Sequence, residues 1–109
     1  MRVWYRVRDL DQGRSFYRDV LGFREDYVDW EARWARLDRN GMEIALVEGE
    51  REESGVAHVD VEDVKAERER LAQAGVDVGV VLELHGYLRL LDVYDPWGNR
   101  IQLAQELVE

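Results

Sequence analysis

One structural pattern occurs twice in this chain of 109 residues. Val7-Arg8-Asp9-Leu10 ends an alternating segment and opens a helical one that stops at Gly22-Phe23. Val61-Glu62-Asp63-Val64 repeats this arrangement before a helical segment that stops at Gly75-Val76, with an offset of 54 residues at the front and 53 at the back. A tandem repeat of a strand-helix-strands unit predicts one domain of two like halves with a cleft between them. We expect the functional residues in that cleft.

The composition indicates a globular domain and restricts its partners. Hydrophobic residues make up 46% of the chain without a long apolar run, so we expect neither a membrane span nor a secretory signal. The absence of cysteine excludes a disulfide framework and a thiolate nucleophile and favours a cytoplasmic location. The net charge of -9 repels phosphate backbones and attracts cations, so nucleic acid is not an expected partner.

The first half of the repeat predicts a strand, a helix and three further strands. Residues 2–8 alternate strictly between two faces, one with Val3, Tyr5 and Val7 and the other with Arg2, Trp4, Arg6 and Arg8, which is typical of a strand. Asp9 and Gln12 form a capping box for the helix, and its apolar stripe is Phe16, Val20 and Leu21. The further strands are expected over residues 23–29, 32–37 and 42–48. Asn40-Gly41 is the strongest hairpin signal in the chain.

The second half follows a linker. Residues 49–55 are charged, bounded by glycines and free of apolar side chains, so we place the first module at about 1–48 and the second at 56–109. The second module predicts a helix capped by Asp63, with Val64, Leu71 and Ala74 facing inward. Its strands are expected over residues 56–61, 78–83, 87–94 and 100–105. In the turn before the last strand, Gly98 can take a positive φ.

Three motifs in order resemble the vicinal oxygen chelate superfamily, which contains glyoxalases, extradiol dioxygenases, fosfomycin-resistance enzymes and bleomycin-resistance binding proteins. They are Asp9-Leu10, the run from Phe16 to Phe23, and Asp95-Pro96-Trp97-Gly98-Asn99-Arg100-Ile101. The resemblance covers essentially the whole chain. It implies an α+β fold of two tandem βαβββ modules, whose curled sheets enclose a cavity that is usually completed in a homodimer.

The resemblance also implies where a metal is held in metal-dependent members. A His lies seven residues before the helix-capping Asp of each half, and a Glu lies in the last strand of each half. In this chain those positions hold Arg2, Val56, Ala45 and Gln102. A divalent ion needs imidazole and carboxylate donors, and these four residues offer at best one amide oxygen. We therefore expect no metal cofactor at the usual site.

A displaced metal site is an alternative. By strand alternation, His58 shares the face of Val56 and Glu43 shares the face of Ala45, so that Glu43, His58 and Asp60 could supply one imidazole and two carboxylates to a divalent metal. The simpler interpretation is a hydrogen-bonded His58, with the carboxylates in salt bridges to Arg2 or Arg6, since a charge in a cavity must be paired.

The residues of inward parity form a mixed pocket wall with aromatic surface, hydrogen-bonding groups and both signs of charge. The ligand-binding candidates are Arg2, Trp4, Arg6, Val47, His58, Asp60 and Gln102. Trp34 and Trp97 are candidates for the mouth of this pocket. The segment from Leu84 to Tyr87 resembles a loop that often covers the ligand in resistance-type members, and we interpret its His85 as a surface residue.

These residues predict a metal-free, non-catalytic protein of the resistance or sequestration type, with a small aromatic or cationic ligand in a cavity at a homodimer interface. No motif for a nucleophile or a phosphate loop is present. The alternative is a glyoxalase-like lyase, isomerase or dioxygenase. It would either use His58 for proton transfer near neutral pH or hold an atypical metal site. Arg2 and Arg6 favour an anionic group against the overall charge, so the sign of the ligand stays open.

Overall fold

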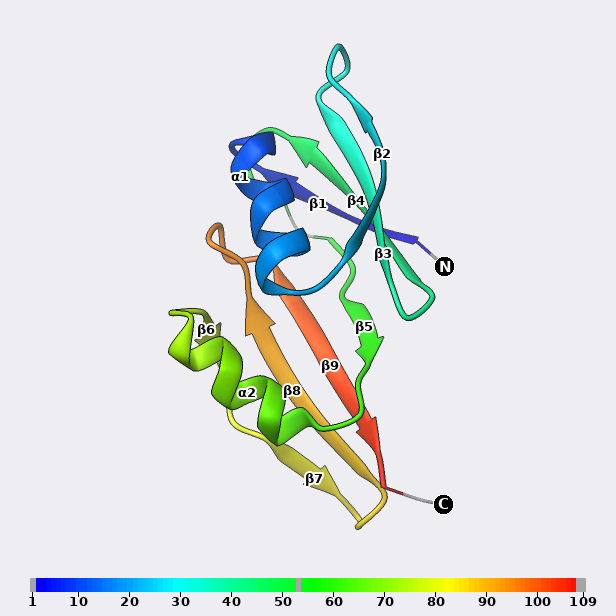
Figure 1. Ribbon diagram of the computed structural model, residues 1–109, viewed down its shortest axis with the longest axis vertical. Coiled ribbons are helices and arrows are strands. Elements are labelled where there is room, and N and C mark those ends of the chain that lie inside the picture. The colour runs from blue at the N-terminus through cyan, green and yellow to red at the C-terminus, as the bar shows by residue number, and fades with distance from the viewer. Residues whose placement is uncertain (1, 53, 108–109) are drawn as a thin grey trace. The chain divides into compact units, whose positions relative to one another are not determined.

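The computed structural model describes residues 2–52 and 54–107, with Arg2 described by its backbone alone. The chain divides into two compact units, Met1–Ala57 and His58–Glu109. Two open, curled sheets are present, one of four strands and one of five, and each has a helix against one face (Figure 1). The predicted α+β fold class is confirmed.

The first unit contains a four-stranded sheet and one helical segment. Its elements in chain order are β1 (Arg2–Val7), α1 (Leu10–Ser15), the π-helical turn η1 (Phe16–Val20), β2 (Arg24–Asp29), β3 (Trp34–Arg39) and β4 (Met42–Glu48). The strand order is β1-β4-β3-β2, with β1 parallel to β4 and the other neighbours antiparallel. The helix covers one face of this sheet, and that face supplies most of the unit's core (Figure 1).

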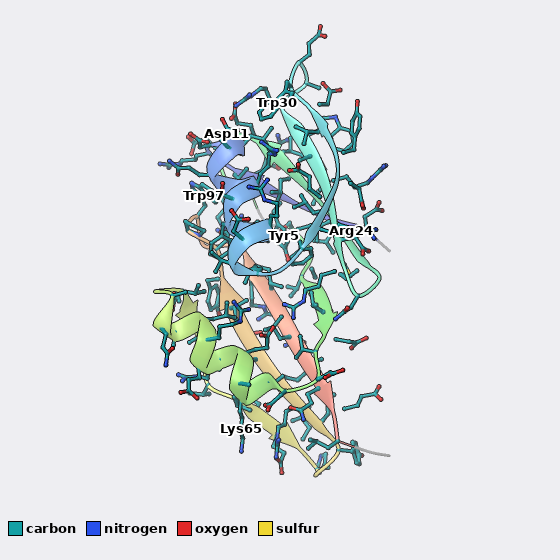
Figure 2. The ribbon with its side chains drawn as sticks, viewed as in Figure 1. Tyr5, Asp11, Arg24, Trp30, Lys65 and Trp97 are labelled. Atoms are coloured by element: carbon teal, nitrogen blue, oxygen red, sulfur yellow. The ribbon has the colours of Figure 1, made fainter. Side chains whose placement is uncertain are left out.

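Alternation along β1 determines which face of the first sheet is buried. Val3, Tyr5 and Val7 are at most 7% exposed, whereas Trp4 on the opposite face is 55% exposed. The ring of Tyr5 stacks on Tyr17 of η1 with 6.0 Å between centroids, and Figure 2 shows Tyr5 beside the helix. Burial of each apolar side chain contributes roughly 1.5–3 kcal/mol, so this face supplies the cohesion of the unit.

The helix departs from its expected stripe because its second part is π-helical. Leu21 N donates to Phe16 O at 3.0 Å, a bond that spans five residues instead of four. The wider turn places Tyr17 in the core, where it is 0% exposed, and leaves Phe16 and Val20 partly exposed. The stripe is therefore corrected: Leu21 is buried as expected, but Tyr17 takes the inward position.

The second unit repeats the order of strand, helix and strands. Its elements are β5 (Ala57–Asp60), which begins at the last residue of the first unit, α2 (Val64–Gln73), β6 (Asp77–Val78), β7 (Leu82–Leu84), β8 (Leu88–Tyr94) and β9 (Arg100–Glu106). The strand order is β5-β9-β8-β6, and β7 also pairs with β8. Figure 2 shows Lys65 extending from α2 away from the sheet. Within residues 2–52 and 54–107, no helix has the length and apolarity to cross a membrane.

Helix caps and turns preserve the repeat at the level of single residues. Asp9 Oδ1 accepts from Gln12 N at 3.0 Å, and Asp63 Oδ1 accepts from Ala66 N at 3.1 Å, so both helices start as predicted. The hairpin at Asn40-Gly41 is also confirmed, with φ values of +52° and +84° between the paired ends of β3 and β4.

Two expectations about element boundaries and one about the facing of a side chain were wrong. β3 begins at Trp34 instead of residue 32, because Asp29 Oδ1 accepts from Ala32 N at 2.8 Å and Arg33 adopts a φ of +58°, which lengthens the turn. The strand expected over 78–83 is the two short strands β6 and β7, separated at Gly79, where a strand is weakened by the missing side chain. Ala74 is exposed because it ends α2 instead of facing inward.

The turn between β8 and β9 is organised by one buried carboxylate. Asp95 is 4% exposed, and its Oδ1 accepts from Trp97 N at 3.0 Å and Asn99 N at 2.9 Å. Its Oδ2 accepts from Asn99 Nδ2 at 2.8 Å, and Gly98 has the expected positive φ of +90°. These bonds satisfy the carboxylate and fix the direction in which β9 enters the sheet.

Glu48 joins three elements of the first unit. Its Oε2 accepts from Leu10 N at 2.9 Å and from Arg33 Nη2 at 2.7 Å, and its Oε1 accepts from Arg33 Nε at 3.0 Å. The hydrogen bonds from Arg33 and then from Leu10 lower the pKa of Glu48 to about 2. The carboxylate therefore ties the end of β4 to the first turn of α1 and to the turn before β3.

Candidate functional site

The face of the first sheet opposite α1 carries aromatic and charged side chains in register. One row across β1, β4 and β3 is Trp4, Ala45 and Arg36, and the next row is Arg6, Val47 and Trp34. Three predicted ligand-binding residues, Trp4, Arg6 and Val47, thus share one face of one sheet. The backbone of Arg2 pairs in register with that of Glu43, and the side chain of Arg2 lies outside the described part of the structure.

A small hollow lies where the linker passes β1. It has a volume of about 70 Å³ and is lined by Trp4, Arg6, Glu52 and Ser54. Arg6 Nε donates to Glu52 Oε1 at 3.0 Å, and the Arg6 guanidinium carbon lies 5.3 Å from the centroid of the Trp4 ring. The hollow therefore combines an exposed indole, a guanidinium held in place and a carboxylate from the linker.

The other predicted ligand-binding residues lie in the second unit, on the face opposite α2. His58 and Asp60 alternate on β5 with the buried Ala57 and Val59, and both are exposed. Asp60 lines a groove of about 430 Å³ whose other acidic members are Glu62 and Glu106.

Gln102 lies in a separate hollow on this face of the second sheet. The hollow measures about 240 Å³ and is lined by Gly79, Val80, Leu82, Leu90, Asp92, Tyr94 and Gln102. Gln102 Nε2 donates to Asp92 Oδ1 at 3.2 Å, and Arg100 Nη1 lies 3.7 Å from Asp92 Oδ2. Apolar walls around one amide and one carboxylate suit an amphipathic small molecule.

The residues at the positions where the resemblance implies metal ligands do not fit a divalent ion. Ala45 offers a methyl group and is 7% exposed, and Val56 offers only aliphatic carbons. Gln102 has one amide oxygen, on a side chain already bonded through its Nε2 to Asp92. A site for zinc, manganese or iron needs three or four nitrogen, oxygen or sulfur donors with defined geometry, which this set does not supply.

The displaced set is divided between the two units. Glu43 Oε1 lies 3.4 Å from Arg36 Nε, so a guanidinium already neutralises this carboxylate, whereas His58 and Asp60 lie on β5. Within the described part of either unit, no three His, Cys, Asp or Glu side chains gather into a group that could hold a metal ion.

Several residues of the two hollows were missed by sequence reasoning. Glu52 and Ser54 belong to residues 49–55, whose composition indicated only a linker between the halves. Asp92 and Tyr94 could have been found, because alternation along β8 gives them one parity and antiparallel pairing places Asp92 opposite Gln102. The segment from Leu84 to Tyr87 is a tight turn between β7 and β8, closed by a bond of 3.1 Å from Tyr87 N to Leu84 O.

The comparisons with known proteins identify the family. The sequence profile of the Glyoxalase/Bleomycin resistance protein/Dioxygenase superfamily matches residues 2–103. The chain therefore belongs to this superfamily, as the ordered motifs indicated. No curated protein sequence matches the chain.

Solved structures share the fold at low sequence identity. An integron cassette protein from the mobile metagenome of the Halifax Harbour sewage outfall superposes with a TM-score of 0.84 at 22% identity, over 96% of both chains. The fosfomycin resistance protein FosX of Listeria monocytogenes, solved with Mn(II) and sulfate, gives 0.77 at 19% identity over 97% of this chain and 88% of that one. Lactoylglutathione lyase of Agrobacterium tumefaciens gives 0.76 at 16% identity, over 96% and 91%.

Proposed function

We propose that this protein binds a small organic molecule without a metal ion. The observation that carries the proposal is the donor set at the positions where the resemblance implies metal ligands: the side chains of Ala45 and Val56 have no donor atom, and that of Gln102 has one amide oxygen. Without such donors, these residues cannot hold the metal ion that a metal-dependent lyase or dioxygenase uses as a Lewis acid.

Two hollows support binding as the function. The hollow at Trp4 and Arg6 presents an exposed aromatic face beside a guanidinium. The hollow at Gln102 presents apolar walls beside Asp92. The hollow at Gln102 combines apolar area with few polar groups, which is the usual composition of a pocket for a small ligand, whereas the hollow at Trp4 pairs one aromatic face with charged groups.

We also propose that the binding protein is a homodimer. Exposed apolar side chains cluster at β7 and its flanks, with Val80 70%, Leu82 54% and Tyr87 55% exposed. β7 pairs with β8 alone among the described strands, so it presents a free backbone edge next to these side chains. A second copy that covers this edge would remove both features from water and enclose the neighbouring hollow.

Ligand binding by a Trp4→Ala variant tests the function. An aromatic compound selected from a screen of cationic, planar and acidic aromatics is titrated into chelator-treated protein by calorimetry. If its ring packs on the indole, we expect Trp4→Ala to weaken binding by about 1–3 kcal/mol. Trp30→Ala is the matched control, since Trp30 is also an exposed tryptophan, 49% accessible, but lies in the turn after β2 (Figure 2).

The proposal fails if binding appears only after a divalent metal is added. It also fails if a compound is turned over and the turnover is lost in His58→Ala, because that outcome supports the enzyme alternative. Equal weakening by Trp4→Ala and Trp30→Ala would remove the first strand from the binding surface.

A further inference from the structure

The linker is fastened along β1 by backbone and side-chain contacts within the first unit. Gly49 N donates to Val7 O at 2.8 Å where the linker begins. Arg8 Nη2 lies 3.2 Å from Glu50 Oε2, and Arg6 Nε lies 3.0 Å from Glu52 Oε1. Two acids of the linker therefore reach two arginines: Arg6, which shares the face of Trp4 on β1, and Arg8, which directly follows this strand.

The two ion pairs differ in their surroundings. Arg8 and Glu50 have side chains 67% and 82% exposed, so their pair is surrounded by water. The side chain of Arg6 is 28% exposed and that of Glu52 is 64% exposed, so the guanidinium is partly enclosed whereas its carboxylate partner comes in from the surface. Only the Arg6–Glu52 pair lines the hollow, together with Trp4 and Ser54.

We propose that this hollow binds the carboxylate of an aromatic acid and that Glu52 occupies the carboxylate position when no ligand is bound. This inference rests on the proposed binding function. A guanidinium beside an indole recognises a planar anion attached to a ring, because the fork of N–H donors matches a carboxylate and the ring can lie on the indole. The hollow of about 70 Å³ beside Glu52 has room for the first carbons of the ligand, whose carboxylate takes the place of the Glu52 carboxylate, and the exposed face of Trp4 receives the ring.

Exchange of one carboxylate for another keeps the charge of Arg6 neutralised. Binding of the ligand therefore does not leave the partly enclosed Arg6 cation without a counter-charge. The displaced Glu52 carboxylate moves into water at little cost, because most of its side chain is already exposed. In the opposite arrangement, a cationic ligand would pair with Glu52 and would have to approach Arg6, which repels it. The geometry thus favours an anion in this hollow although the net charge of the chain is -9.

The test compares Glu52→Gln with Glu50→Gln, which remove the same charge from the same linker. Phenylacetate, the neutral phenylacetamide and the cationic benzylamine are titrated into each variant with EDTA present, by tryptophan fluorescence and calorimetry. We expect Glu52→Gln to bind phenylacetate about fivefold more tightly than wild type, the factor that corresponds to roughly 1 kcal/mol for an exposed competing ion pair. Glu50→Gln should bind it within about twofold of wild type, because Glu50 does not line the hollow.

A third variant fixes the role of the guanidinium. Arg6→Gln should remove the preference for phenylacetate over phenylacetamide, and circular dichroism verifies that it is folded. The inference is overturned if Glu52→Gln does not tighten binding, if Glu50→Gln tightens it equally, if benzylamine binds better than phenylacetate, or if phenylacetate binds none of the proteins. The proposed function is still supported after any of these outcomes if another compound binds without metal. If every compound binds only when metal is added, the proposed function itself is wrong.

Discussion

At the scale of the residue, one buried hydroxyl joins β1 to Ala57, the last residue of the first unit. Ala57 N donates to Tyr5 Oη at 2.8 Å, and Tyr5 is 1% exposed. Tyr5→Phe leaves this N–H without its acceptor in a buried place, so we expect a loss of about 1–3 kcal/mol in the free energy of unfolding, measured with urea. Tyr27→Phe, on a side chain 46% exposed, is the control and should change stability by less than about 0.5 kcal/mol. Equal losses in both variants would contradict the role of the Tyr5 hydroxyl.

Alternation shows which residues of one strand share a face, but it does not show which residues of an irregular segment meet them. Trp4 and Arg6 lie on one face because successive side chains of a strand point to opposite sides. The contact between Arg6 and Glu52 spans 46 positions and depends on the path of a linker that has no periodic pattern. For this reason the sequence indicated the wall of the first hollow and missed its acid.

At the scale of the element, Glu48 couples the end of β4 to the start of α1. Its pKa is about 2 in the folded chain against an ordinary value of 4.5, so its ionised form is favoured by folding. That contribution to stability is complete above about pH 4.5 and is lost as the pH falls from there toward 2. Glu48→Gln should therefore be less stable than wild type at neutral pH, and the difference should shrink across this acid range.

Denaturant unfolding of both proteins at a series of pH values measures this difference. Glu50→Gln is the control because Glu50 also belongs to a surface ion pair but has a side chain 82% exposed. The difference in the free energy of unfolding between wild type and Glu48→Gln should not stay constant from neutral pH to pH 2. A constant difference would show that the carboxylate acts through its shape and not through its charge.

Helix caps and tight hairpins could be predicted because they depend on a few adjacent residues. Asp9, Asp63 and Asn40-Gly41 each specify their local backbone without help from the rest of the chain. The π-helical turn at Phe16 could not be predicted in this way, because a bond from Leu21 N to Phe16 O changes the phase of the helix and leaves no composition signal. The positive φ of Arg33 could not be predicted either. Its side chain is bonded to Glu48, which is 15 positions away in the sequence.

At the scale of the whole molecule, the exposed edge at β7 predicts association. Light scattering of the purified protein should give a mass near twice 12.8 kDa. Leu82→Glu places a charge among the exposed apolar side chains of this edge and should shift the population toward the monomer on dilution. A wild-type mass that stays at the monomer value at all concentrations would refute the dimer without affecting the fold.

The absence of metal donors is the central claim about the whole molecule, and metal content tests it most directly. The protein is purified under mild conditions without chelator, and zinc, nickel, iron and manganese are measured per chain by elemental analysis. The account predicts much less than one equivalent of each, because the side chains of Ala45 and Val56 have no donor atom and that of Gln102 has a single amide oxygen. One equivalent per chain that is lost in His58→Ala would contradict it and would place the metal at the displaced set of Glu43, His58 and Asp60.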